Sequence, residues 1–152
     1  MKTLIALLLL LPALAAADPQ PWMKKDNPSE LTPLLSIGSG CSLTQENISG
    51  IVEGVMVRSR IKPMDEVGTL NLLVTIDCVK FDNLNPDVIS VSVDFVGLAN
   101  AGEDQVLIRW GAFGGAMLGL GDNADAERLI REGVEDAIAS YLQVNSDLGA
   151  DE

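Results

Sequence analysis

The chain has 152 residues, with 22 acidic side chains against ten basic ones and no histidine. Its formal net charge of −12 disfavours binding to nucleic acid and to anionic lipid surfaces. The lack of histidine excludes Ser-His and Cys-His nucleophilic sites as well as histidine metal ligands.

The first 17 residues have the pattern of a secretory signal peptide. A positive start at Lys2 precedes an apolar run over residues 4–14, and three alanines at 15–17 form a cleavage site. The run is too short to span a bilayer, and no later stretch is long and apolar enough, so no stable membrane insertion is expected. The mature chain is predicted to be exported, to the periplasm or to the medium. Without Lys2 it has nine basic residues against 22 acidic ones, a net charge of −13 that favours basic partners.

Two cysteines remain, Cys41 and Cys78, at a separation of 37 positions. In an oxidising compartment a disulfide between them is the favoured interpretation, and two buried free thiols are the alternative. The chain-entropy model assigns such a loop about 4 kcal/mol of stabilisation. A bonded pair leaves no thiolate for catalysis or for zinc binding.

Residues 18–40 contain four of the seven prolines and are predicted to form an extended arm. Trp22 either packs back on the domain or contacts a partner, and packing is favoured because an exposed indole is costly. A turn at Gly38-Ser39-Gly40 then leads into a single domain over residues 41–145. Residues 146–152 form a polar, acidic tail that is predicted to be disordered.

The first of two amphipathic helices is predicted over residues 43–61. Thr44 is the expected N-cap, and apolar residues recur at spacings of three and four along one stripe. Gly50 and Gly54 lower the helix propensity of this segment. Their presence indicates a close approach of the helix backbone to a sheet.

Three strands and a second helix are predicted to follow. Alternating apolar residues indicate a central strand over residues 69–81, a second strand over 88–96 and a third over 105–110. The second helix is predicted over residues 124–143, with Asp122 or Asn123 as the N-cap. The inward positions of the first two strands are Leu70, Leu72, Val74, Ile76, Cys78, Ile89, Val91, Val93 and Phe95.

The fold class predicted from this order is α+β. Short loops, including one at residues 97–104, indicate an antiparallel meander of three to four strands. Residues 111–121 contain five glycines and no charge, which is compatible with a bent continuation of the third strand. Two amphipathic helices packed on one face of the sheet complete a two-layer sandwich.

The stretch around residues 110–120 contains the candidate site. Large apolar side chains of this kind anchor interfaces or line apolar pockets, and the favoured alternative is that they complete the core of the domain. The candidates are Trp110, Phe113, Met117, Leu118 and Leu120.

Two further motifs are better explained by turn chemistry. Residues 119–124 match G-x-G-x-x-A, but a dinucleotide site needs a parallel strand after the helix. Residues 82–87 offer oxygen ligands for calcium, yet they lack the glycine and the distal glutamate of an EF-hand loop. No metal or cofactor is expected. Without any constellation of acid, base and nucleophile, the chain is not expected to be an enzyme.

The leucine-rich signal, the helix–meander–helix order and the glycine-rich residues 113–122 ahead of a terminal helix form a recognisable pattern. The pattern resembles that of uncharacterised small exported proteins of Gram-negative bacteria. This resemblance implies a location in the envelope or the secreted fraction, and it implies no particular activity.

Two functions remain open at this stage. The first is an exported module that binds another protein through its sheet or through residues 110–120. The alternative is a carrier of a small apolar ligand between sheet and helices. A closed cavity lined by Phe113 and Met117 would favour the carrier, and a filled core with an exposed apolar patch would favour the protein-binding module.

Overall fold

The computed structural model describes residues 21–80, 87–102 and 104–146, without the side chains of residues 110–115. The predicted signal peptide lies outside this part, and so does the predicted tail beyond Ser146. The elements in chain order are the 3-10 helix η1 (Pro21–Met23), β1 (Glu30–Ile37), α1 (Gln45–Arg58), β2 (Lys62–Pro63), β3 (Asn71–Val79), β4 (Asp87–Ala101), β5 (Asp104–Gly121) and α2 (Asn123–Ser146).

The strands form one sheet in the order β2-β1-β3-β4-β5, with β3 at its centre as predicted. β3, β4 and β5 form the expected antiparallel meander, whereas β1 runs parallel to both β2 and β3. The α+β class is confirmed, but the sheet has five strands and is mixed. A parallel pair needs a crossover connection, and α1 supplies it between β1 and β3.

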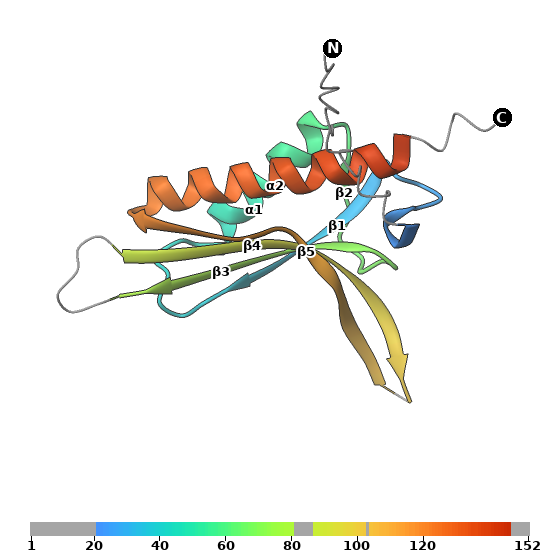
Figure 1. Ribbon diagram of the computed structural model, residues 1–152, viewed down its shortest axis with the longest axis horizontal. Coiled ribbons are helices and arrows are strands. Elements are labelled where there is room, and N and C mark those ends of the chain that lie inside the picture. Colours follow the sequence, from blue (N-terminus) through green and yellow to red (C-terminus); the bar gives the residue numbers. More distant parts are fainter. Residues whose placement is uncertain (1–20, 81–86, 103, 147–152) are drawn as a thin grey trace, which may run out of the picture.

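Both helices lie side by side on one face of the sheet, as Figure 1 shows. The hydroxyl oxygen of Thr44 caps α1 by accepting a hydrogen bond from the Asn47 N–H at 3.3 Å. The carboxylate of Asp122 caps α2 by accepting one from the Ala124 N–H at 2.8 Å. The largest fully buried core side chains include Phe95, Leu72 and Ile76 of the sheet, Ile48 and Met56 of α1, and Ile130, Ile138 and Tyr141 of α2.

Residues 21–40 do not form the predicted arm. β1 is an inner strand of the sheet, Leu31 is fully buried, and Trp22 packs against the core as favoured. Pro33 is tolerated because backbone groups alternate in direction along a strand. The Leu31 carbonyl accepts from the Met64 N–H on the β2 side, so Pro33 turns its nitrogen to the same side, where β2 has ended. The domain therefore begins well before residue 41.

The segment ahead of β1 is held by the last turns of α2. The side-chain oxygen of Asn145 accepts from the Lys25 N–H at 3.0 Å, and its amide nitrogen donates to the carbonyls of Met23 and Tyr141. The Tyr141 hydroxyl donates to the Pro28 carbonyl at 3.0 Å. These bonds satisfy the buried amide of Asn145 and bring the two ends of the described chain together.

The predicted disulfide is present. Cys41 and Cys78 are bonded, with 4.9 Å between their Cα atoms, so α1 begins beside the end of β3. The turn before Cys41 crosses β3 closely, because a Cβ added at Gly40 would overlap the Cys78 carbonyl oxygen. A disulfide of this kind fits an exported protein.

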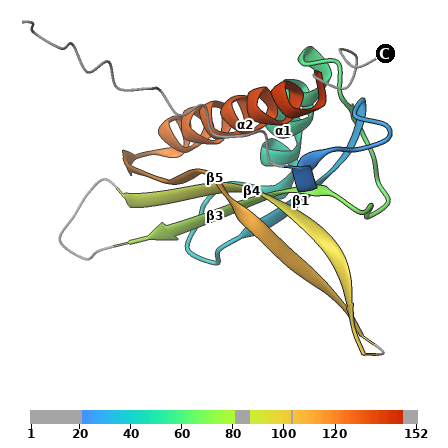
Figure 2. The ribbon, with the colours of Figure 1, turned by 45° about the vertical axis from the view of Figure 1, so that its right-hand side comes forward.

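The predicted loop at residues 97–104 is wrong. β4 and β5 continue through this region as a two-stranded hairpin, and Gly102 at the tip has a φ of 72°. Figures 1 and 2 show that the hairpin leaves the sheet on the side away from the helices. The strand signal was missed because the tip residues Ala99, Asn100 and Gly102 do not alternate between apolar and polar.

A bulged stretch separates the hairpin from the helix-covered part of the sheet. Between the pairs Ser92–Ala116 and Asp94–Ala112, β5 has two more residues than β4, and another register shift follows before Val96. Extra residues on one strand bend it and increase its twist. β5 therefore does continue through the glycine-rich stretch, with the expected bend.

Candidate interaction surface

The residues of β5 nearest α2 alternate between two environments. Met117 faces the helix layer and packs against the core, and it lies against Gly133 of α2. A Cβ added at Gly119 would lie 2.6 Å from Leu129 Cδ1. Glycine on β5 and glycine on α2 thus each make room for a side chain of the other element. This close approach accounts for Gly119 and Gly133.

The same approach does not occur at α1. A Cβ added at Gly50 would meet nothing within 4 Å, and one at Gly54 would meet only the Arg58 side chain. The prediction that these two glycines bring α1 close to the sheet is therefore wrong. The glycines that do allow a close approach of helix and sheet are Gly119 and Gly133, between β5 and α2.

The other face of β5 is turned away from the helices and is open. Leu118 and Leu120 are 72% and 64% exposed. Leu120 pairs with Val88, and Val88 pairs with Val79, so three strands contribute to one apolar row. We call Val79, Val88, Leu118 and Leu120 the face patch.

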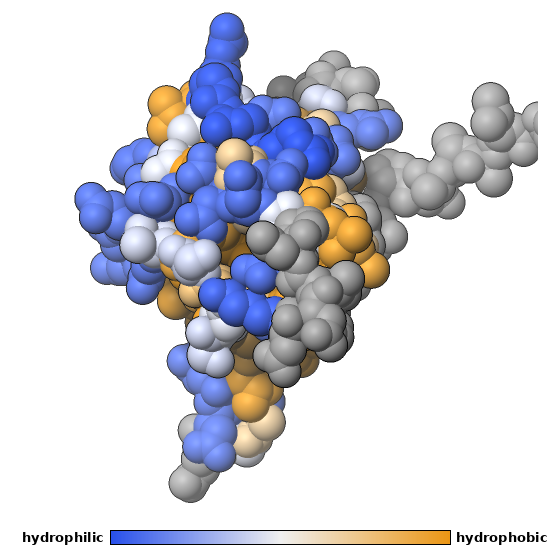
Figure 3. Space-filling model, turned by 90° about the vertical axis from the view of Figure 1, so that its left-hand side faces the viewer, coloured by the Kyte–Doolittle hydropathy of each residue, from blue (hydrophilic) through white to orange (hydrophobic). Residues whose placement is uncertain are grey.

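The hairpin carries a second exposed apolar group. Val106, Leu107 and Ile108 are consecutive residues of β5, and all three are exposed. Figure 3 shows apolar residues along the projecting hairpin. A projecting two-stranded ribbon has no other element packed on its faces, and such ribbons are only marginally stable alone in water. We call these three residues the hairpin patch.

A charged pair sits where the hairpin leaves the sheet. Asp94 is fully buried although it lies on the outer face, and its Oδ2 accepts a hydrogen bond from Arg109 Nη2. Arg109 also donates to Ser92 Oγ at 3.2 Å. The bond to Asp94 raises the pKa of Arg109, which stays charged. Asp94 Oδ1 has no hydrogen-bond partner among the described residues.

Asp94 lies at an outward position of β4, where a side chain exposed to water would be expected, yet it is buried. It is buried because the bulges bend the hairpin and carry Arg109 over it. The charged pair couples β4 to β5 at the point where their register shifts.

The five predicted site residues do not form one group. Met117 belongs to the core side, and Leu118 and Leu120 belong to the face patch. The side chains of Trp110 and Phe113 lie outside the described residues. Val106, Leu107 and Ile108 were not among the predicted site residues, because they were assigned only to a third strand of the sheet, over residues 105–110.

Three cavities are lined by described residues. One, of about 640 Å³, opens at the end of the sandwich where α2 begins, and its lining includes Asp87, Asp122 and Glu127. Two others, of about 360 and 310 Å³, lie beside Arg60 and beside Glu53. None of the three is lined by Met117, so none of them is the closed apolar cavity that would favour the ligand carrier.

The remaining motifs are accounted for as follows. Residues 119–124 join an antiparallel strand to α2, and no strand follows α2 in the described chain, so the dinucleotide geometry is not formed. Five of the six residues of the predicted calcium alternative, 82–86, lie outside the described part. Within that part, no three His, Cys, Asp or Glu residues are grouped to hold a metal ion. Neither α1 nor α2 has the length and hydropathy needed to cross a membrane.

Comparisons with known proteins identify no family. No protein-family model and no curated protein matches the sequence. Among solved structures, the chain is similar to a minor lipoprotein from Acinetobacter baumannii, with 11% sequence identity and a TM-score of 0.33. The match covers 80% of this chain and 93% of that one.

Proposed function

We propose that this chain is an exported, non-enzymatic module that binds another protein through β5. The observation that carries the proposal is the distribution of exposed large hydrophobic residues. Eight large hydrophobic residues are exposed in the described part of the chain. Five of them belong to β5: Val106, Leu107, Ile108, Leu118 and Leu120. Contiguous exposed apolar surface on a folded protein marks interaction sites.

The chemistry of β5 supports binding rather than catalysis. Leu118 and Leu120 supply contact area and no acid, base or nucleophile. The bonded Cys41 and Cys78 support export, since such bonds form and persist in oxidising compartments. Apart from Arg109, the sequence of β5 between Gln105 and Gly121 has no charged residue, which suits the apolar centre of a protein interface.

Site-specific photo-crosslinking in the exporting cell tests this proposal. A benzophenone side chain at Leu118 is expected to capture one discrete protein partner. The matched control is the same group at Val57 of α1, which is 62% exposed but lies away from β5. Equal capture at both positions, or no capture at Leu118, would contradict the proposal.

A further inference from the structure

The two edges of the sheet are protected very differently. One edge is formed by β2, which has only two residues, Lys62 and Pro63, and beyond them by β1, which carries Pro33. Short length, lysine and proline are the usual features that keep an edge from pairing with another chain. β5 forms the other edge, runs from Asp104 to Gly121, and has neither charge nor proline over residues 110–121.

Residues 116–121 are the part of this edge that is best prepared for pairing. They run in regular register with β4, from Ala116 opposite Ser92 to Gly121 opposite Asp87. Backbone groups on the far side of this stretch face no other strand of the sheet. An unpaired edge of this kind is a template for a further strand.

A strand added here would have two chemically different neighbours. On the outer side it would lie beside Leu118 and Leu120, which are exposed. On the helix side it would lie beside the flank of α2 that carries Leu129, the residue in contact with Gly119. Because successive side chains of a strand point to opposite faces, its residues would alternate between these two environments.

The flank of α2 beside β5 is acidic. Asp125, Glu132 and Asp136 share the helix face of Leu129, since they lie three, four or seven residues from it. Arg128 pairs with Asp125 at 3.6 Å and with Glu132 at 3.1 Å, so one cation stands against three carboxylates. The flank therefore favours basic side chains.

We propose that residues 116–121 accept an extended segment of a partner protein, in which apolar and basic residues alternate, as a sixth strand of the sheet. This inference rests on the proposed function and specifies the chemistry of the partner. The apolar residues of the segment pack beside Leu118 and Leu120. Its basic residues face the α2 flank at Asp136 and Glu132.

A second copy of the chain fits this edge poorly. Two-fold pairing of β5 with β5 would place both α2 helices on the same face of the joined sheet. Their acidic flanks, each with Asp125, Glu132 and Asp136, would then face one another, and each chain has a net charge of −12. Like charges placed opposite each other disfavour association.

Binding of synthetic hexapeptides to the mature protein tests the inference. A capped peptide of alternating valine and lysine is expected to bind saturably in titration calorimetry, and the valine–glutamate peptide is not. Two versions of the first peptide, each N-methylated on a different set of alternate residues, are expected to differ in their binding to the protein. Only the version whose unmethylated N–H groups face β5 should bind.

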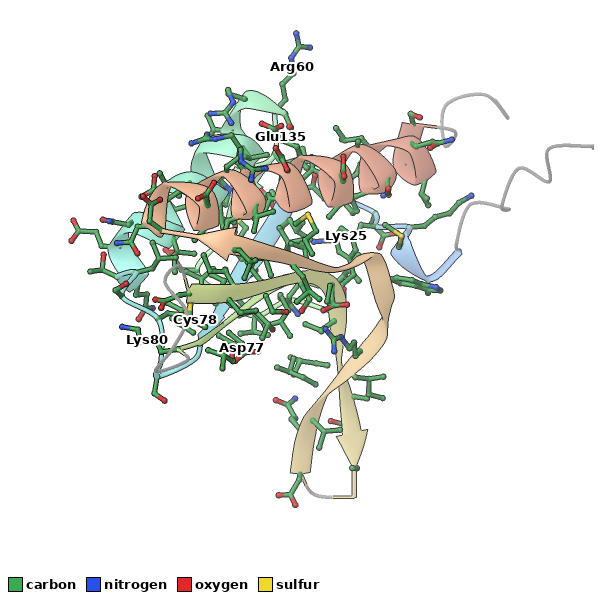
Figure 4. All side chains as sticks on the ribbon, turned by 60° about the vertical axis from the view of Figure 1, so that its left-hand side comes forward. Lys25, Arg60, Asp77, Cys78, Lys80 and Glu135 are labelled. Carbon is green, nitrogen blue, oxygen red and sulfur yellow. A yellow bond between two sulfur atoms is a disulfide. The ribbon has the colours of Figure 1, made fainter. Side chains whose placement is uncertain are left out.

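Variants on α2 provide the matched comparison. Asp136→Lys is expected to weaken binding of the valine–lysine peptide at least tenfold. Glu135→Lys is the control, because Glu135 lies on the other flank of α2 (Figure 4). It pairs there with Arg58 of α1 at 3.5 Å. Asp136→Asn should give an intermediate loss, since it removes the charge without reversing it.

Three results would overturn the inference. They are equal binding of both N-methylated peptides, equal effects of the variants at residues 135 and 136, and a dimer in sedimentation that protects residues 116–121 from hydrogen exchange without peptide. If the peptides fail to bind while a partner is still captured at Leu118, the edge inference fails and the proposed function stands.

Discussion

The two ends of α2 hold their neighbours by different physical means. Near its start, Leu129 and Gly133 contact β5 through close apolar packing, in which glycines accommodate the facing side chains. Near its end, Tyr141 and Asn145 hold residues 23–28 through hydrogen bonds to backbone groups. Packing excludes any added atom, whereas hydrogen bonds depend on the identity of single polar groups.

This difference explains where each end is exposed. At the β5 end Met117 and Gly119 face the helix, and because successive side chains of a strand point to opposite faces, Leu118 and Leu120 face outward. At the other end the short helix η1 packs its Met23 into the core, and Asn145 provides donors and an acceptor to the backbone around it. The candidate surface is therefore the side of β5 that is opposite its packed side.

The largest effect is expected where a substitution disrupts the packing between α2 and β5, and it allows the two faces of β5 to be compared. Met117→Asp places an unpaired carboxylate against Gly133 and the core, and should lower the free energy of unfolding by about 3 kcal/mol. Leu118→Asp changes an exposed position and should stay within about 0.5 kcal/mol. Urea denaturation measures both values. Equal losses would show that the two faces of β5 are not distinct.

A smaller effect is expected from filling the space at Gly119. Gly119→Val should cost about 1–3 kcal/mol, because its Cβ overlaps Leu129 Cδ1. Gly50→Ala is the control, since its new Cβ meets nothing, and it should gain about 0.5–1 kcal/mol of helix stability. Thermal melting followed by circular dichroism records both shifts. A stabilised Gly119 variant would refute the close approach of α2 to β5.

The smallest effect sharpens the hydrogen-bonded end. Burial raises the pKa of the Tyr141 hydroxyl from 10.0 to about 12. Its contribution to stability is complete below pH 10 and is lost as the pH rises toward 12, because the unfolded chain ionises first. Tyr141→Phe should lose about 1 kcal/mol at neutral pH and remove this part of the alkaline loss. Urea midpoints at several pH values between 8 and 12 measure this loss of stability. If the midpoints of the wild type and of Tyr141→Phe fell equally steeply with pH, Tyr141 would not be the source of the loss.

Much of the helix-covered layer could be predicted from local pattern. Alternation in β3 and β4 identified inward residues such as Val74 and Val91, which are fully buried. Helix periodicity and capping chemistry located α1 and α2 at Thr44 and Asp122. These signals are local, since side-chain spacing and caps depend on neighbours within a few residues.

The candidate surface could be predicted only in part. An uncharged, glycine-rich stretch pointed to Met117, Leu118 and Leu120, but composition does not distinguish their faces. The side on which each residue lies follows from the register of β5 with β4, which two register shifts set. A single-residue slip would exchange the faces, so register decides which residues are core.

The sequence by itself determined the α+β class, the two amphipathic helices, the central strand and the pairing of Cys41 with Cys78. Tertiary structure alone decided that β1 enters the sheet, that the hairpin continues past residue 97, and that Asp94 is buried. The reason is the range of the interactions. A proline-rich segment becomes a strand only because β3 lies beside it, and an aspartate on the outer face is buried only because a bulged strand carries Arg109 across it.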